Sequence, residues 1–363
     1  MLRPIPIAAI FTFTLGVGAA GAQGPPGGAP TAAAPAVSAS IANPAISVIG
    51  WFQAVAGSDQ ETQGNPAEFR EAEIAFQAVV DPFTRADFFV AVGEEGVEIE
   101  EGFITWLALP GSGQAKVGQF RADFGKFNRT HPPETPFADR PLAAAAFLGE
   151  EGLTVTGASL SALLPNPADL YWEVVGHLAA APDAQESPVF QADRRADLFA
   201  LARTSLFVPL GEGADLNLGA SYANAPAREE LRADGLHAQL ATGDLTFRWK
   251  NPRRSIYRSF LAQVEVLGER GSRTDAERYT GGFAYALYQF ARQWKVGARY
   301  DWTESPGSHE RIRGALALLQ YKPSEFSTLS LQARRVREPD GAERDAAFFK
   351  WTFNIGPHGA DPY

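Results

Sequence analysis

The C-terminal stretch Phe348–Tyr363, FFKWTFNIGPHGADPY, alternates apolar and polar side chains over its first half. In a β-strand, successive side chains point to opposite faces. The apolar face carries Phe349, Trp351, Phe353 and Ile355, and the polar face carries Lys350, Thr352 and Asn354. The stretch therefore predicts a strand with one apolar and one polar surface, and the fold depends on what covers the apolar one.

Similar segments of alternating polarity recur through the chain, from Ile46 to Ile355. Sixteen of them can be counted. Their approximate bounds are 46–56, 69–80, 86–94, 102–109, 115–123, 152–164, 170–178, 196–208, 216–224, 240–250, 257–268, 279–288, 294–303, 312–322, 328–337 and 346–355. Sixteen strands give about 19 residues for each strand with its connection, which leaves room for the ~9–11 residues of a membrane strand. Fourteen strands are the fallback, because alternation is weak in the third, fourth and fifth segments.

The connections between these segments fall into two kinds. Every second one is short and rich in turn-forming residues, such as DPFTR at 81–85, PGSGQ at 110–114 and PNPAD at 165–169. The intervening connections are mostly longer and more charged, and the longest is the 27-residue segment 125–151. Short turns on one side and long loops on the other are typical of outer-membrane barrels.

The composition limits how the protein can be stabilised and what it can bind. The chain has 363 residues, no cysteine and a formal net charge of -10. Disulfides are therefore excluded, and without clustered Cys or His we expect no metal site and no cofactor. The acidic balance argues against a nucleic-acid partner.

The N-terminus has the features of an exported protein. In residues 1–22 a basic residue precedes an apolar run that ends in the small residues AGA at 20–22, as in a signal peptide. A membrane anchor is the alternative, but the run is shorter than the ~20 residues that a spanning helix needs. Residues 23–45 are rich in Gly, Pro and Ala, which predicts a flexible segment before a single domain over 46–363.

A membrane barrel explains these patterns better than a soluble protein. Alternation also occurs in soluble sandwiches, but these strands are longer than the usual soluble strand and carry aromatic residues near their ends. In hydrocarbon, an open sheet edge would leave backbone N–H and C=O groups without partners, so the sheet has to close. We predict an all-β fold, a transmembrane antiparallel up-and-down β-barrel of about sixteen strands in the bacterial outer membrane, with a wet lumen.

Several motifs add a family resemblance. They are VGQF at 117–120, FGKFN at 124–128, the pair Arg140-Pro141 and GEEGL at 149–153. These motifs resemble outer-membrane proteins of the phosphate-selective porin O and P type. The ending NIGPHGADPY is similar to the tails of uncharacterised members, some of which are labelled TonB-dependent receptors. The resemblance implies a sixteen-stranded outer-membrane channel, usually a trimer, that passes small anions such as phosphate.

Alternation also assigns charged side chains to the lumen. The predicted pore-lining basic residues are Arg203, Arg248, Lys250, Lys295, Arg299, Arg334 and Lys350. The predicted acidic ones are Glu71, Glu73, Glu173, Asp244, Glu265, Glu269 and Asp301. These equal numbers predict a mixed lumen, in which the arginine ladder of the family cannot be placed residue by residue.

Two outcomes follow for these charges. Opposed charged walls would set up a field that favours small polar solutes, with anions preferred where Arg299, Arg334 and Lys350 converge. Alternatively, the charges pair across neighbouring strands, as Lys350 would with Glu71 or Glu73.

The long segment 125–151 is a candidate constriction loop. It carries Lys126, Arg129, His131 and Arg140, and long loops often have such functional roles. The alternative is a surface loop that only caps the barrel.

The predicted function is that of a passive outer-membrane porin for small polar solutes, anions such as phosphate among them. No catalytic motif is present, so we expect no enzyme. One alternative is a TonB-linked receptor-like protein without a plug, although that class has a plugged barrel of about 22 strands. Another is a secreted soluble all-β ligand-binding protein. The expected partners are outer-membrane lipid, the solutes and further copies of the chain in a homotrimer.

Overall fold

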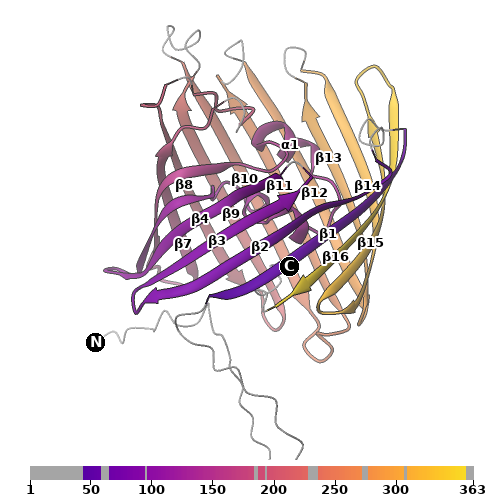
Figure 1. Cartoon of the computed structure of the whole chain (residues 1–363), viewed down its shortest axis with the longest axis horizontal. Helices are drawn as coiled ribbons and strands as arrows, with labels where there is room; N and C mark the ends of the chain where they lie inside the picture. The colour runs from indigo at the N-terminus through magenta and orange to yellow at the C-terminus, as the bar shows by residue number, and fades with distance from the viewer. Residues whose placement is uncertain are drawn as a thin grey trace, which may run out of the picture.

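The computed structural model describes residues 44–58, 65–94, 96–183, 187–192, 194–227, 236–271, 277–305 and 309–356. The predicted signal peptide, residues 1–22, and residues 23–43 of the predicted flexible segment lie outside these ranges, as does the C-terminal stretch from residue 357. Within the described ranges, sixteen antiparallel strands form one sheet that closes on itself as a barrel (Figure 1).

Each strand pairs with its neighbours in the sequence, and the last pairs with the first. The strands are β1 (Ala45–Gly57), β2 (Ala67–Asp81), β3 (Thr84–Gly93), β4 (Gly96–Leu109), β5 (Gly113–Arg121), β6 (Thr154–Leu163), β7 (Tyr171–Ala180), β8 (Leu198–Pro209), β9 (Ala214–Pro226), β10 (His237–Lys250), β11 (Ser259–Arg270), β12 (Arg278–Ala291), β13 (Trp294–Glu304), β14 (Arg311–Ser324), β15 (Ser327–Arg337) and β16 (Glu343–Ile355). The predicted fold class and strand number are confirmed. A two-sheet soluble sandwich is excluded, because all the strands belong to one closed sheet.

The quoted C-terminal stretch forms the strand that closes the barrel. In β16, Phe349 pairs with Ala54 of β1, and Lys350 pairs with Gln53. The side chain of Trp351 is exposed on the outer surface, whereas Lys350 is only 3% exposed and faces inward. Closure thus gives each backbone group along this seam a partner, which a strand in hydrocarbon requires.

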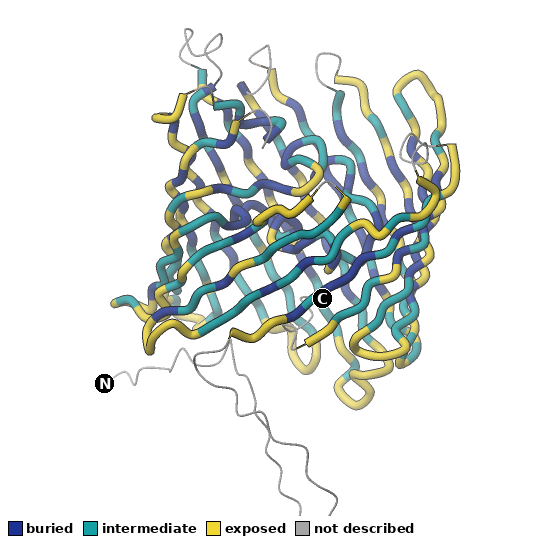
Figure 2. Tube along the Cα trace, viewed as in Figure 1, coloured by how far each residue is buried: buried dark blue, intermediate teal, exposed yellow. Residues whose placement is uncertain are grey.

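The two faces of the sheet differ in polarity. Burial alternates along the strands (Figure 2), and large apolar side chains such as Leu160, Val264 and Leu331 are exposed on the outside. Charged and amide side chains, among them Gln332 and Arg334, take the buried inward positions. An outer surface of this kind is suited to lipid, and no helix among the described residues is long and apolar enough to cross a membrane.

One strand departs from the sequence-based bounds by more than three residues. The strand β4 begins at Gly96, well before the predicted start at residue 102. Phe89 of β3 pairs with Glu101 and the next residue, Val90, pairs with Ile99, so Glu100 is the extra residue of a β-bulge. A bulge interrupts the alternation of faces, which is why the pattern failed to reveal this part of the strand.

Replacing Leu331 by Arg tests which face meets lipid. Leu331 lies near the middle of β15 with its side chain 57% exposed. An arginine near the bilayer midplane costs about 2–4 kcal/mol in a membrane barrel. We expect that loss in urea unfolding of the protein in lipid vesicles, and a smaller loss for Leu331→Ala, which removes apolar contact without adding charge. Equal effects of the two variants would contradict the assignment of the outer face.

Candidate functional site

The connection between β5 and β6, residues 122–153, lies inside the barrel and is called here the lumen loop (Figure 1). It contains the 3-10 helices η3 (Phe127–Arg129) and η4 (Pro132–Glu134) and the helix α1 (Leu142–Leu148). Four of its aromatic side chains are 0–1% exposed, namely Phe124, Phe127, Phe137 and Phe147. The loop therefore packs against the inner wall, and the alternative of a loop that only caps the barrel does not hold.

Small wall residues make room for the helix of the lumen loop. A Cβ atom at Gly281 of β12 would lie 2.7 Å from Cε2 of Phe147 and 2.9 Å from Cβ of Ala143. Beside this contact, the rings of Phe127 and Phe283 meet edge to face with centroids 5.3 Å apart. Glycine on the wall and aromatic rings on the loop thus form an apolar contact inside an otherwise polar lumen.

A carboxylate of the inner wall accepts hydrogen bonds from the backbone at the start of the loop. The backbone N–H groups of Lys126 and Phe127 both donate to Oε2 of Glu265, at 3.1 and 3.2 Å. Gly125 has φ of 62°, and a Cβ atom there would lie 1.9 Å from Oε1 of Glu265. The positive φ and the close carboxylate favour glycine at this position, and Glu265 acts as an anchor for the loop.

Asp139 of the loop binds two of the predicted pore arginines. Its Oδ2 lies 2.6 Å from Nη2 of Arg299 and 2.7 Å from Nη1 of Arg334. Arg299 also donates from Nε to Asp301 at 2.9 Å, and Gln332 donates to Oδ1 of Asp139. Burial favours the neutral acid, but Arg299 and Arg334 outweigh it and lower the pKa of Asp139. The two arginines converge as expected, but on a carboxylate of the chain itself.

Lys350 is held by the same loop. Its ammonium donates to the backbone oxygens of Pro132, Thr135 and Phe137 at 3.1, 2.9 and 3.0 Å. It also lies 4.3 Å from the ring centroid of Trp51. The hydrogen bonds of this ammonium therefore lead to loop carbonyls, rather than to the carboxylates of β2 as in the alternative stated above.

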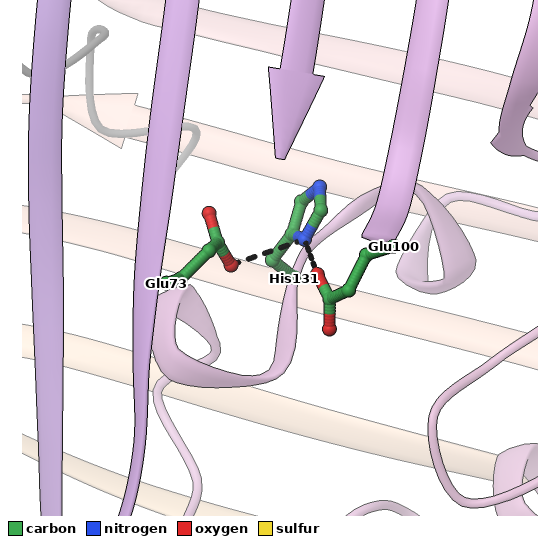
Figure 3. Close-up of side chains that lie close together, drawn as sticks. All are labelled: Glu73, Glu100 and His131. Carbon is green, nitrogen blue, oxygen red and sulfur yellow. Dashed lines mark hydrogen bonds and ion pairs between the residues drawn. The ribbon is translucent and has the colours of Figure 1, made fainter. Parts of the chain in front are cut away.

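The loop residue His131 lies among carboxylates of β2 and β4 (Figure 3). Its Nδ1 lies 2.6 Å from Oε2 of Glu100 and 3.1 Å from Oε2 of Glu73. Its Nε2 lies 2.7 Å from Oε1 of Glu101, and the ring stacks on Phe89 with centroids 4.8 Å apart. The bulge in β4 explains why the adjacent residues Glu100 and Glu101 both reach one ring.

The electrostatics of this group favour a positive charge on the ring. Burial and the neighbouring Arg121 favour the neutral imidazole, but Glu73 and the hydrogen bonds with Glu100 and Glu101 outweigh them. Together they hold the pKa of His131 well above its usual value. A cationic group bound to the ring nitrogens, whether a proton or another ion, is what this environment stabilises.

Cations also gather where the loop begins. Arg129 pairs with Asp123 at 3.0 Å but keeps 49% of its side chain exposed, and Asp123 also pairs with His177. Burial and repulsion from Arg248 lower the pKa of the nearby Lys126 to about 8. Lys126, Arg129 and Arg248 are therefore close enough to form a basic side of the lumen.

Arg140 stabilises the loop internally. Its Nη2 donates to Oδ1 of Asn128 at 3.2 Å. Asn128 in turn donates from Nδ2 to the backbone oxygens of Ala122 and Leu153, each at 2.9 Å. These bonds join the two ends of the loop, so Arg140 is a structural residue of the loop rather than an exposed cation of the pore.

The remaining predicted residues lie mainly on the inner wall. Arg203 binds Asp244 at 2.8 Å with both side chains buried, and Arg248 binds Asp215 at 2.8 Å. Glu269 is buried as well. The residues that are half-buried are Glu71, Glu173 and Lys295. Lys250 differs in burial, since it is exposed at the last residue of β10.

A cavity of about 440 Å³ lies between the loop and the first two strands. Its charged lining residues are Glu68, Arg70, Asp139, Arg140, Glu150, Glu151 and Arg334. Acidic and basic side chains both contribute, which agrees with the mixed lumen expected from the sequence.

Three of the residues that fasten the loop were not predicted from the sequence. Asp139, Glu100 and Glu101 were not among the predicted site residues. The signal available for the last two was the run EIEEG at 98–102, where carboxylates are dense and the alternation fails. For Asp139 no local pattern was available, because its arginine partners are more than 150 residues away in sequence.

Comparison with known proteins supports the fold. No protein-family model matches the chain. An uncharacterized protein of Aquifex aeolicus is 26% identical over 330 residues, which covers 80% of this chain and 69% of that protein. Among solved structures, OprB of Pseudomonas putida matches 86% of this chain and 94% of its own, with a TM-score of 0.58 and 8% identity.

Two further solved structures are similar. An anion-selective porin from Comamonas acidovorans has a TM-score of 0.55 and 10% identity, covering 86% of this chain and all of that one. The trimer form of OmpT, an outer membrane protein of Vibrio cholerae, has a TM-score of 0.53 and 10% identity, covering 86% of this chain and 100% of that one.

The fold, the apolar outer surface and the polar lumen define a porin-type β-barrel. The chain is a barrel of the bacterial outer membrane.

Replacing Asp139 by Asn tests how the loop is held. The change leaves Arg299 and Arg334 buried without their shared carboxylate, and breaking a buried pair in this way costs about 3–5 kcal/mol. We expect faster hydrogen exchange in residues 122–153. The matched control is Asp345→Asn, which removes the exposed partner of Arg335 and should leave the loop unchanged. Equal protection in both variants would contradict the proposed anchor.

The same variant predicts a pH dependence. The folded-state pKa of Asp139 is lowered below its usual 3.8, so its contribution to stability is present above pH 3.8 and is lost as the pH falls through the folded pKa. The stability difference between wild type and Asp139→Asn should therefore persist down to about pH 4 and disappear only below it.

Proposed function

We propose that this protein is a passive outer-membrane channel for small polar solutes, anions such as phosphate among them. The observation that carries the proposal is the lumen loop, which is fastened to the inner wall by buried charged groups. Sixteen strands enclose a lumen wide enough for water, and a folded loop inside it reduces the free cross-section. A lumen lined and narrowed in this way admits small hydrophilic molecules and rejects large ones.

The charges inside the lumen favour general polar solutes over one tightly bound anion. Arg299 and Arg334 share Asp139, and Lys350 is surrounded by loop carbonyls. These residues are therefore occupied by the chain. An anion preference would instead come from the basic side of the lumen defined above, where Arg129 is half-exposed. We therefore propose a preference for anions such as phosphate, and not a closed binding site for phosphate.

The alternatives agree less well with the barrel. A TonB-linked receptor has about 22 strands around a plug, whereas sixteen strands close this sheet. Many charged groups of the described lumen pair with one another in anchoring roles, and this favours a channel over an enzyme.

Bilayer recordings test the channel and its basic side together. The purified protein in a planar bilayer should give stable open steps without any energy source, and a silent membrane would contradict the proposal. Replacing Lys126 and Arg129 by Gln should shift the reversal potential in a salt gradient towards cation preference. Arg335→Gln, on the outer surface, serves as the control. Unchanged selectivity in the double variant would remove these two residues from the solute path.

We also propose that the barrel assembles as a homotrimer. The outer surface of β14, β15 and β16 carries the small residues Ala315, Ala317, Ala333 and Ala347, which line a shallow groove of about 640 Å³. A flat surface of small side chains lets a second copy approach closely. The trimer form of the similar structure described above supports this assembly.

Replacing Ala333 by Trp should disrupt the trimer. The large ring would stand out from the groove and block close approach of a second copy. Analytical ultracentrifugation in detergent is expected to give a trimer for wild type and a monomer for Ala333→Trp, with Leu160→Trp on a distant strand as the control. A wild-type monomer would contradict the proposal.

A further inference from the structure

The geometry points to a binding site for a divalent transition-metal ion of the zinc type, formed by Glu73, Glu100 and His131 (Figure 3). The three residues come from β2, from β4 and from the lumen loop. A bound ion would therefore join the loop to two strands of the wall. This inference concerns how the loop is fastened, and it holds whether or not the barrel conducts.

The ligand atoms are already close to a metal-binding arrangement. Nδ1 of His131 and one carboxylate oxygen each of Glu73 and Glu100 all lie within 4.8 Å of one another. Ligands at about 2.0–2.2 Å around a tetrahedral zinc ion stand about 3.4 Å apart. The Nδ1–Oε2 distances of 3.1 Å to Glu73 and 2.6 Å to Glu100 need to widen by less than about 1 Å to reach that spacing.

A buried carboxylate oxygen in this group lacks a hydrogen-bond donor. Each ring nitrogen carries at most one hydrogen, and the short contacts of Nδ1 and Nε2 are with Glu100 and Glu101. Oε2 of Glu73 receives no hydrogen bond, although the Glu73 side chain is only 3% exposed and is directed at Nδ1. A buried oxygen without a donor is costly, and a metal ion would satisfy it.

Further contacts support the three ligands. Glu101 binds the second ring nitrogen, Nε2, which is the arrangement that orients a metal-ligating histidine in known sites. Glu101 in turn accepts a hydrogen bond from the backbone N–H of Arg121 at 2.8 Å, and the Arg121 guanidinium lies 3.4 Å from Oε1 of Glu100. His131 and Glu100, drawn in the centre and on the right of Figure 3, thus have partners that fix their orientation.

The donor set indicates the class of ion. One imidazole nitrogen and two carboxylates suit Zn²⁺ and similar transition metals, whereas Ca²⁺ takes 6–8 oxygen ligands and Mg²⁺ retains most of its water. The ion would replace the proton on Nδ1, because ligation requires the bare nitrogen. We expected no metal site from the sequence because the histidines are far apart. The proposed site uses a single histidine with carboxylates from two strands.

Zinc titration of the full chain tests the inference. The detergent-folded protein is treated with EDTA, dialysed and titrated with ZnCl₂ by calorimetry at mildly alkaline pH. We expect one saturable site per chain, weakened more than about tenfold in Glu73→Gln, which keeps the side-chain volume, and in His131→Ala. His177→Ala is the matched control, since His177 is a lumen histidine bound to Asp123 and outside the site.

Two further outcomes decide the result. Zinc should slow hydrogen exchange of residues 122–153 in wild type and not in Glu73→Gln, and CaCl₂ should have no such effect. The inference is overturned if no saturable binding occurs, if binding survives both ligand variants, or if calcium binds equally well. None of these measurements depends on conductance, so they are separate from the test of the channel.

Discussion

The constraint on which the structure depends is that backbone N–H and C=O groups in hydrocarbon need partners within the protein. An open sheet of this length would leave one row of such groups unpaired at each edge. Pairing between β16 and β1 removes both edges. Once the sheet closes, the alternation along each strand leaves no choice of arrangement. Apolar side chains such as Leu331 and Trp351 face lipid, and the polar set faces the interior.

This sorting creates a second requirement inside the barrel. Many charged side chains of the inner wall are buried, and a buried charge without a partner is strongly unfavourable. The lumen loop supplies many of the partners. Asp139 binds Arg299 and Arg334, three carbonyls bind Lys350, and two N–H groups bind Glu265. The loop is therefore part of the electrostatic balance of the wall as well as an obstacle in the pore.

The sequence was a good guide to the parts of the structure that repeat and a poor guide to the parts that do not. Alternation revealed the sixteen strands and placed residues such as Arg203 and Asp301 on the inner face, because the pleat fixes the direction of each side chain. It failed at β4, where the bulge at Glu100 breaks the rule. The partners of Asp139 and His131 depend on how the loop folds back across the lumen, and no local pattern encodes contacts between such distant parts of a chain.

The reach of the lumen loop has a consequence for the order of assembly. His131 contacts carboxylates of β2 and β4, whereas Asp139 contacts β13 and β15, so the loop binds strands on both sides of the β1–β16 seam. The partners Arg299, Arg334 and Lys350 are synthesised long after the loop itself. Contacts of such large sequence separation form late, because the intervening chain has to be ordered first. The loop can reach its final position only when the last strand arrives, so its docking reports that the barrel is complete.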